Sequence, residues 1–225
     1  NWDPEKIKLT PEQESCVAQI NGERVLYGDI AVDTNLCYSS EKVQNLLTDY
    51  IVKYAKEHPE ADYLHLWIAD NCNNHCECEN CAQMTPSDWY VNILTILDKK
   101  LEKENLPVKI VFLLYFELLW PPEKNIHINK DRFTLMFAPF TRTFEQAYCE
   151  CKDTEYKLPE FVRNNITLPK KTEEYIAHLK AWQKIFDGDS FDYDYYLCKA
   201  HYGDPSYYRI ASLISRDVKY MKEMG

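Results

Sequence analysis

Apolar residues follow two different spacings along the chain, and segments with the two spacings alternate. Four segments place apolar residues three and four positions apart, as in a helix that buries one face: residues 40–57, 85–101, 175–186 and 204–225. Five shorter segments are apolar runs or alternate apolar with polar residues, as strands do: residues 34–38, 63–70, 108–116, 133–139 and 191–197. The sequence therefore predicts strands and helices in turn.

Two of the predicted helices also carry start signals. Ser40 is a suitable N-cap for the helix at 40–57. The segment "TPSD" at 85–88 resembles a capping box, with Pro86 suited to the first helical position.

The order of these elements predicts a parallel sheet with helices packed outside it. No glycine-rich turn follows a strand, as a doubly wound nucleotide-binding sheet would need, so a (β/α)8 TIM-like barrel is favoured. A complete barrel has eight strands in about 250 residues, more strands than this sequence predicts. We therefore expect residues 31–225 to form a partial or irregular barrel with long loops. Residues 1–30 would be an N-terminal extension or a preceding loop, and the rest of a larger chain would complete the barrel.

Polar and aromatic side chains gather where the predicted strands end, which is where barrels build their active sites. The candidate catalytic residues are the acids Asp70, Glu117 and Asp194. The candidate substrate-binding residues are Trp67, Asn71, Tyr115, Arg142, Asp192, Tyr193 and Tyr195. Glycoside hydrolysis needs a protonated acid and a second carboxylate, and aromatic rings can stack against sugars. These residues predict a carbohydrate site.

Each of these polar side chains also has a simpler explanation. Asp70 follows a strand and could be a turn or helix cap, and Glu117 could be solvated. Arg142 could pair with a neighbouring acid. Strict alternation puts Asp192 and Asp194 on one face of their strand, which a polar outer surface explains equally well. The sequence leaves both interpretations open.

A cysteine-rich loop follows directly behind Asp70. Cys72, Cys76, Cys78 and Cys81 have the spacing C-x3-C-x-C-x2-C, with His75 among them. Four soft ligands in one loop can close a tetrahedral Zn²⁺ site that has no open position for water. We therefore expect a structural zinc ion bound by Cys76, Cys78 and Cys81, with Cys72 or His75 as the fourth ligand.

Disulfide bonds and free thiols are the alternatives to a metal. The segment "YCEC" at 148–151 supplies two more cysteines and Cys198 another, and the total of 9 is odd. Disulfides between these loops would favour an extracellular or cell-envelope location, because such bonds persist under oxidising conditions.

Charge and hydropathy exclude two kinds of partner. The net charge of −10 and a pI near 5.1 do not fit a nucleic-acid surface, which needs clustered Lys and Arg. No segment reaches the roughly 18 to 20 apolar residues of a membrane helix, so we expect no membrane insertion. The polar N-terminus lacks a signal peptide's apolar region and an initiator Met, which is typical of a processed chain or a piece of a longer one.

Several segments together resemble a known family. They are "NLCYSSEKVQNLLTDYIVKYAKEHPEADYLHLWIADNCNNHCECENC", "SDWYVNILTILDKKL", "FAPFTRTF" and "FDYDYY", within about residues 30–225. They are similar to a bacterial domain family of uncharacterised function, usually found in large carbohydrate-processing proteins. The family resembles α-glucuronidase and β-hexosaminidase barrels, which implies a glycoside hydrolase-like fold. Asn71 follows Asp70 where hexosaminidases have an Asp-Glu pair, so the resemblance does not carry their substrate-assisted mechanism over.

Taken together, these patterns predict a protein that binds a poly- or oligosaccharide and hydrolyses it with paired carboxylates at the barrel mouth. Two alternatives remain at the level of sequence. One is a catalytically silent carbohydrate-binding barrel, and the other is a metal-stapled interaction module.

Overall fold

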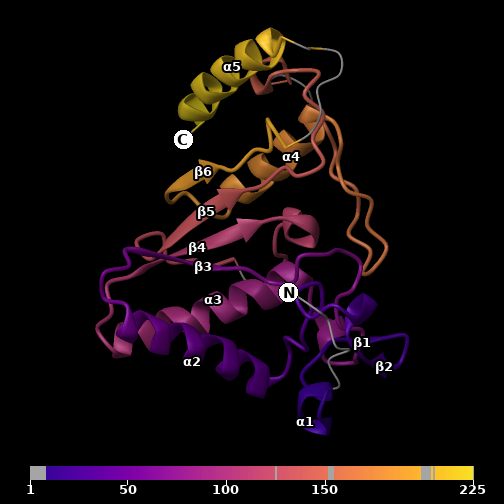
Figure 1. The fold of residues 1–225 in the computed structure, drawn as a ribbon, viewed down its shortest axis with the longest axis vertical. Coiled ribbons are helices and arrows are strands. Elements are labelled where there is room, and N and C mark those ends of the chain that lie inside the picture. The colour runs from indigo at the N-terminus through magenta and orange to yellow at the C-terminus, as the bar shows by residue number, and fades with distance from the viewer. Residues whose placement is uncertain (1–8, 125, 152–154, 199–203, 205, 225) are drawn as a thin grey trace.

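A four-stranded parallel sheet forms the centre of the computed structural model, which describes residues 9–124, 126–151, 155–198, 204 and 206–224 (Figure 1). Its strands lie in chain order: β3 (Tyr63–Leu66), β4 (Lys109–Leu114), β5 (Phe133–Phe137) and β6 (Ser190–Asp192). All three strand pairs are parallel, which confirms the predicted α/β class and parallel sheet. Within the described residues the sheet is open, and no closed barrel is seen.

Helices cover one face of this sheet. They are α2 (Glu41–Glu57), α3 (Pro86–Lys103) and α4 (Thr172–Gln183), and α5 (Tyr208–Met224) lies beyond β6 (Figure 1). Alternate residues of β4, Ile110, Phe112 and Leu114, share one buried core with side chains of α2, α3 and α4. Within it the Phe112 ring lies 5.9 Å from the Trp182 ring of α4, between ring centroids. The helical stripe at 175–186 thus packs on the sheet, as the pattern predicts.

The opposite face of the sheet carries the intervening residues. Val111 and Leu113 of β4 form a smaller buried cluster with Met136 of β5 and with Ala138. Tyr115 and Tyr195, just past the ends of β4 and β6, pack against the same cluster. This face therefore continues from an apolar centre to an aromatic edge where the strands end.

The N-terminal segment packs against the cysteine-rich loop. It contains α1 (Pro11–Glu14) and an antiparallel hairpin of β1 (Gln19–Ile20) and β2 (Glu23–Arg24). The hairpin turns at Asn21 and Gly22, both at positive φ, as tight hairpin turns require. The Glu77 N–H donates to the Gln19 carbonyl over 2.8 Å, so the described part of the expected extension is joined to the loop at 71–81.

Three predicted strands are shorter or absent in the structure. Residues 34–38 form only an isolated antiparallel bridge between Leu36 and Val17, so the prediction of a strand there is wrong. β3 ends at Leu66 because the chain then turns toward the N-terminal segment, where the Asp70 N–H donates to the Val32 carbonyl. β6 ends at Asp192, and one further bond, from Tyr193 N–H to the Phe137 carbonyl, extends its pairing.

Short 3-10 helices complete the described chain. They are η1 (Tyr27–Asp29), η2 (Cys81–Gln83), η3 (Phe116–Leu119) and η4 (Tyr148–Cys151). None of the helices in the described ranges combines the length and the apolar character that a bilayer-spanning segment needs.

Candidate functional site

A cavity of about 570 Å³ lies where the strands end, on the face of the sheet turned away from α2, α3 and α4. It brings together six residues of the predicted carbohydrate site: Trp67, Asp70, Asn71, Tyr115, Tyr193 and Tyr195. They reach it from the segments after β3, β4 and β6, because parallel strands deliver their C-terminal ends to one edge. We call this cavity the aromatic pocket.

Aromatic rings form most of the wall of this pocket. Phe116 and Phe140 join the predicted tyrosines, and the Tyr115 and Phe116 ring centroids lie only 3.8 Å apart. Phe140 and Tyr193 each meet Tyr195 edge-on, at 5.2 and 5.5 Å between centroids. Edge-to-face packing holds each ring in a fixed orientation, so the wall is a preformed surface.

Phe116 has an unusual backbone at the lip of the pocket. Its φ of 50° lies in the left-handed region, which a bulky aromatic residue rarely adopts. Such a conformation costs about 1 to 3 kcal/mol and concentrates at functional sites. The left-handed conformation turns the chain from β4 into η3 and places the Phe116 ring beside Tyr115.

Asp70 is an exposed acid beside two tyrosines. Burial, and then the nearby Asp70 carboxylate, raises the pKa of Tyr115 above its usual range. Burial also raises the pKa of Tyr195 to about 12, with Tyr193 and Asp70 as further causes. Both hydroxyls therefore keep their protons at neutral pH and can donate hydrogen bonds into the pocket.

Glu117 lies outside the pocket wall, although it follows Tyr115 by two residues. Its side chain is buried, and its Oε1 accepts the Asn73 N–H over 2.5 Å. Its Oε2 is 3.6 Å from His75 Nε2 and has no hydrogen-bond partner among the described residues. The structure therefore puts this acid beneath the cysteine-rich loop and away from Asp70's cavity.

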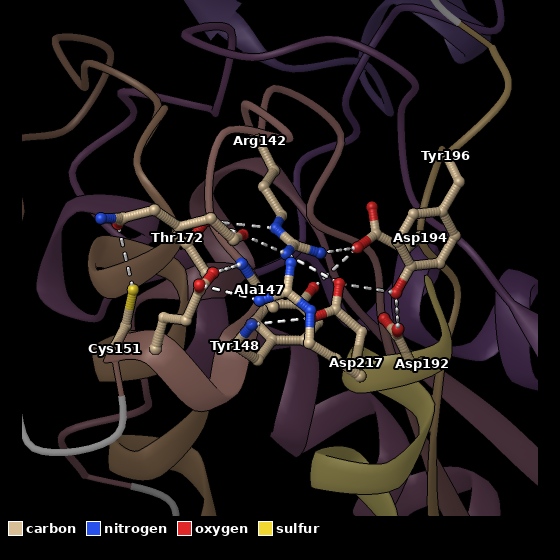
Figure 2. A network of polar contacts seen from close by, with 12 residues as sticks. Arg142, Ala147, Tyr148, Cys151, Thr172, Asp192, Asp194, Tyr196 and Asp217 are labelled. Carbon is tan, nitrogen blue, oxygen red and sulfur yellow. Dashed lines mark hydrogen bonds and ion pairs between the residues drawn. The ribbon is translucent and has the colours of Figure 1, made fainter. Parts of the chain in front are cut away.

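Arg142 and Asp194 face each other in a buried network away from the pocket (Figure 2). The Arg142 guanidinium donates to Asp194 and, over 2.8 Å, to Asp217 of α5. It also lies 3.6 Å from the ring centroid of Tyr148, whose hydroxyl donates to Asp194. The alternative that Arg142 pairs with a neighbouring acid is what the structure shows.

Asp192 is the third acid of this network (Figure 2). The Tyr196 hydroxyl lies 3.4 Å from Asp192 Oδ2 and 3.1 Å from Asp217 Oδ2. Burial, and then the neighbouring Asp194, raises the pKa of Asp192 to about 8. Burial likewise raises the pKa of Asp194. The pKa values of both acids are therefore raised, but the acids join β6 to α5 and do not line the aromatic pocket.

Four cysteines meet behind the pocket: Cys37, Cys76, Cys78 and Cys81. Their sulfur atoms all lie within 4.8 Å of one another. Hydrogen bonds from the Cys76 and Cys81 thiols lower the pKa of Cys37, and the bond to Cys37 raises that of Cys81. We call these four residues the cysteine cluster, and they are consistent with a structural metal site.

Two residues of the loop do not join this cluster as expected. Cys72 lines the aromatic pocket, and His75 faces Glu117. Cys37 takes the fourth position, which the spacing of the loop could not indicate because Cys37 lies far upstream. All nine cysteines are within the described residues, and none of them forms a disulfide.

These features define the class of protein. It is an α/β domain with an aromatic pocket at the ends of its strands and a cluster of four cysteines. Over residues 11–225 the chain matches the family model described as "Domain of unknown function (DUF4838)", and it belongs to this family. No curated protein and no solved structure matches the chain. Membership of an uncharacterised domain family is thus confirmed, and the relation to glycoside hydrolase barrels stays a prediction.

Proposed function

We propose that this domain binds a carbohydrate in the aromatic pocket. The observation that carries the proposal is the gathering of Trp67, Tyr193 and Tyr195 around the exposed carboxylate of Asp70. Trp67 and Tyr193 are each 46% exposed, so their ring faces are open to a ligand. Pockets that combine apolar rings with a few convergent polar groups are typical ligand sites.

Each part of the pocket has a matching part on a sugar. The C–H face of a pyranose ring is apolar and packs on an aromatic ring, as large flat side chains favour. The Asp70 carboxylate accepts hydrogen bonds from sugar hydroxyls. Asn71 and the protonated hydroxyls of Tyr115 and Tyr195 add donors at the same wall. The ligand is therefore an uncharged or weakly charged poly- or oligosaccharide.

Hydrolysis is the second candidate function, and one observation favours it. Glu117 has a buried Oε2 without a hydrogen-bond partner among the described residues, and such an atom calls for an explanation. Hydrolysis requires two carboxyl groups about 5 to 9.5 Å apart across one ligand. Asp70 is the only carboxylate among the described residues of the pocket wall, so Glu117 would have to turn toward it. Binding is the better supported function.

A metal ion in the cysteine cluster is a separate matter from carbohydrate binding, because the cluster and the aromatic pocket share no residue. We propose that it is Zn²⁺, that it shapes the loop behind Asp70, and that it takes no part in the chemistry.

The binding test uses a panel of neutral polysaccharides in affinity electrophoresis, followed by calorimetry with the best ligand. Asp70→Asn and Trp67→Ala should each weaken binding by about 10- to 100-fold, since each removes a buried contact with the ligand. Asp62→Asn is the matched control, because Asp62 is also exposed but lies at the opposite end of β3. Binding that both pocket variants retain in full would end the proposal.

The same panel tests hydrolysis. Incubation with the unchanged protein should release reducing ends only if two carboxyl groups act together, so Asp70→Asn and Glu117→Gln should each abolish the release. Binding without release, in the unchanged protein, would identify a carbohydrate-binding domain.

A further inference from the structure

The sulfur atoms of the cysteine cluster have the spacing of a metal's ligand shell. Cys37 Sγ lies 3.7 Å from Cys78 Sγ and 3.8 Å from Cys81 Sγ. Four sulfurs at about 2.3 Å from a tetrahedral Zn²⁺ are themselves about 3.8 Å apart. A disulfide needs about 2.0 Å between two sulfurs, so the observed separations match the first arrangement.

We propose that Cys37, Cys76, Cys78 and Cys81 bind one Zn²⁺ in a closed tetrathiolate site that fastens the N-terminal segment to the loop at 71–81. Cys37 is the ligand that makes this fastening, because the other three belong to the loop itself. With all four positions taken by sulfur, the metal has no open position for water or substrate.

The surroundings of the cluster suit the charge of such a site. Four thiolates and one Zn²⁺ carry a net charge of about −2, which the protein has to balance. Arg24 lies with a guanidinium nitrogen 3.8 Å from Cys37 Sγ, and the Gln19 N–H donates to Cys76 Sγ over 3.3 Å. Donors directed at the sulfurs hold metal ligands in place and stabilise their thiolate form.

A second arginine holds the loop that carries three of the ligands. Arg163 donates to the carbonyls of Cys76, Cys81 and Met84, over 3.2 Å and 2.9 Å to the first two. It therefore adds a positive charge near the cluster and fixes the backbone at both ends of the C-x-C-x2-C segment. Two arginines thus lie close to the cluster, one from the hairpin and one from the segment before α4.

A bound metal would stabilise the folded form of the loop at 71–81. The segment from Cys72 to Cys81 has no aliphatic side chain, and its only ring is that of His75. Its cysteines are its only apolar side chains. A loop with so little apolar surface gains its order from polar contacts and from bound metal, so metal binding energy is folding energy. The site contains no group of the aromatic pocket, and the inference therefore stands independently of the carbohydrate proposal.

The first experiment measures the metal in the unchanged chain. Purified without chelator, the protein should hold about one equivalent of zinc, and X-ray absorption should find four sulfur neighbours at about 2.3 Å. Less than about one tenth of an equivalent, or iron in place of zinc, would overturn the proposal. A shell of three sulfurs and one nitrogen would also overturn it, because His75 would then replace a cysteine.

The second experiment identifies the fourth ligand. Cys37→Ser should lose zinc to a competing chelator far more readily than the unchanged protein, whereas Cys72→Ser should retain it. Cys72 is a matched control, since it belongs to the same loop and lies outside the cluster. Arg24→Gln leaves all four ligands present and should weaken zinc binding by about 10- to 100-fold. Zinc loss in the Cys72 variant with retention in the Cys37 variant would assign the ligand to Cys72.

Discussion

At the scale of single residues, the buried network around Arg142 contains more acidic than basic groups. One guanidinium faces three carboxyl groups, from Asp192, Asp194 and Asp217, with the Tyr148 and Tyr196 hydroxyls beside them. Burying three negative charges against one positive charge is unfavourable, so one acid keeps its proton. Asp192 is that acid, because its pKa is raised to about 8 and its Oδ1 has no hydrogen-bond partner among the described residues.

The proton on Asp192 makes stability depend on pH. The folded protein binds this proton between about pH 4 and pH 8, whereas the unfolded chain releases it near pH 4. The free energy of unfolding should therefore fall as pH rises through this range, by on the order of 1 kcal/mol per pH unit, and level off above it. Asp192→Asn should remove this part of the slope in urea denaturation, and the exposed Asp62→Asn should not. An equal slope in the Asp192 variant would contradict the assignment.

The sequence predicted that Asp192 and Asp194 lie on one face of their strand. It did not predict that this face points into a buried network with Arg142 and Asp217. Alternation along 191–197 puts Asp192 and Asp194 on one face, and both do join one network. Which face they occupy depends on Arg142 and on Asp217, which lies beyond β6 in the chain, and no local pattern contains that information. Cys37 was missed for the same reason, since a ligand supplied from a distant segment leaves no spacing to read.

On the scale of elements, the start of α3 connects the helix to the chain after β4. Thr85 and Asp88 form the predicted capping box, in which each side chain accepts the other's N–H. Asp88 is fully buried, and its Oδ1 also accepts the N–H groups of Glu123 and Lys124, over 3.0 and 2.6 Å. One carboxylate thus serves as helix cap and as the attachment of a loop.

This double role predicts an order of stabilities. Thr85→Ala should lower the free energy of unfolding by about 1 kcal/mol, the usual cost of a lost cap. Asp88→Ala should cost about 3 kcal/mol, since it leaves the N–H groups of Thr85, Glu123 and Lys124 without their acceptor. Ser40→Ala is the control, because Ser40 is the N-cap of α2 but makes no side-chain capping bond, and its cost should be below about 0.5 kcal/mol. Urea denaturation measures all three, and equal losses at Thr85 and Asp88 would contradict the double role.

The sequence predicted elements best where local signals and burial agree. The capping box at 85–88 and the apolar run of β4 were both found, because a helix start and a doubly buried strand are marked by adjacent residues. The prediction of a strand at 34–38 was wrong, since Leu36 pairs with only one residue, Val17. Pairing partners decide whether a short extended segment becomes a strand, and they are distant in sequence.

For the whole molecule, the loop that carries three residues of the cysteine cluster differs from the sheet and its helices in how it is stabilised. The sheet and its helices share a large apolar core, whereas the loop at 71–81 is held by polar contacts, among them Asn35 to Asn74 and Asn164 to the backbone of His75. Local stability follows the number of buried apolar contacts, so the loop is the part that a metal bound at the cluster would stabilise most.

Removal of metal should therefore loosen one part of the molecule and leave the other intact. After chelation, amide hydrogen exchange should quicken in residues 71–81 and in the N-terminal hairpin, while β4 stays protected within the core. Zinc added back should restore the original exchange. A uniform increase over the whole chain, or none at all, would contradict this division.

The burial of β4 has a consequence for how the chain reaches its folded state. β4 pairs with β3 on one side and β5 on the other, and the paired residues, such as Leu66 with Phe112 and Leu114 with Phe137, are far apart in the sequence. Contacts between distant segments close slowly, so this domain should fold more slowly than a helical protein of its length. Until both neighbours arrive, "KIVFLL" is a strongly apolar strand with no proline, the kind of segment that pairs with copies of itself. Refolding from denaturant should succeed best at low protein concentration, where the slow correct pairing is not overtaken by aggregation.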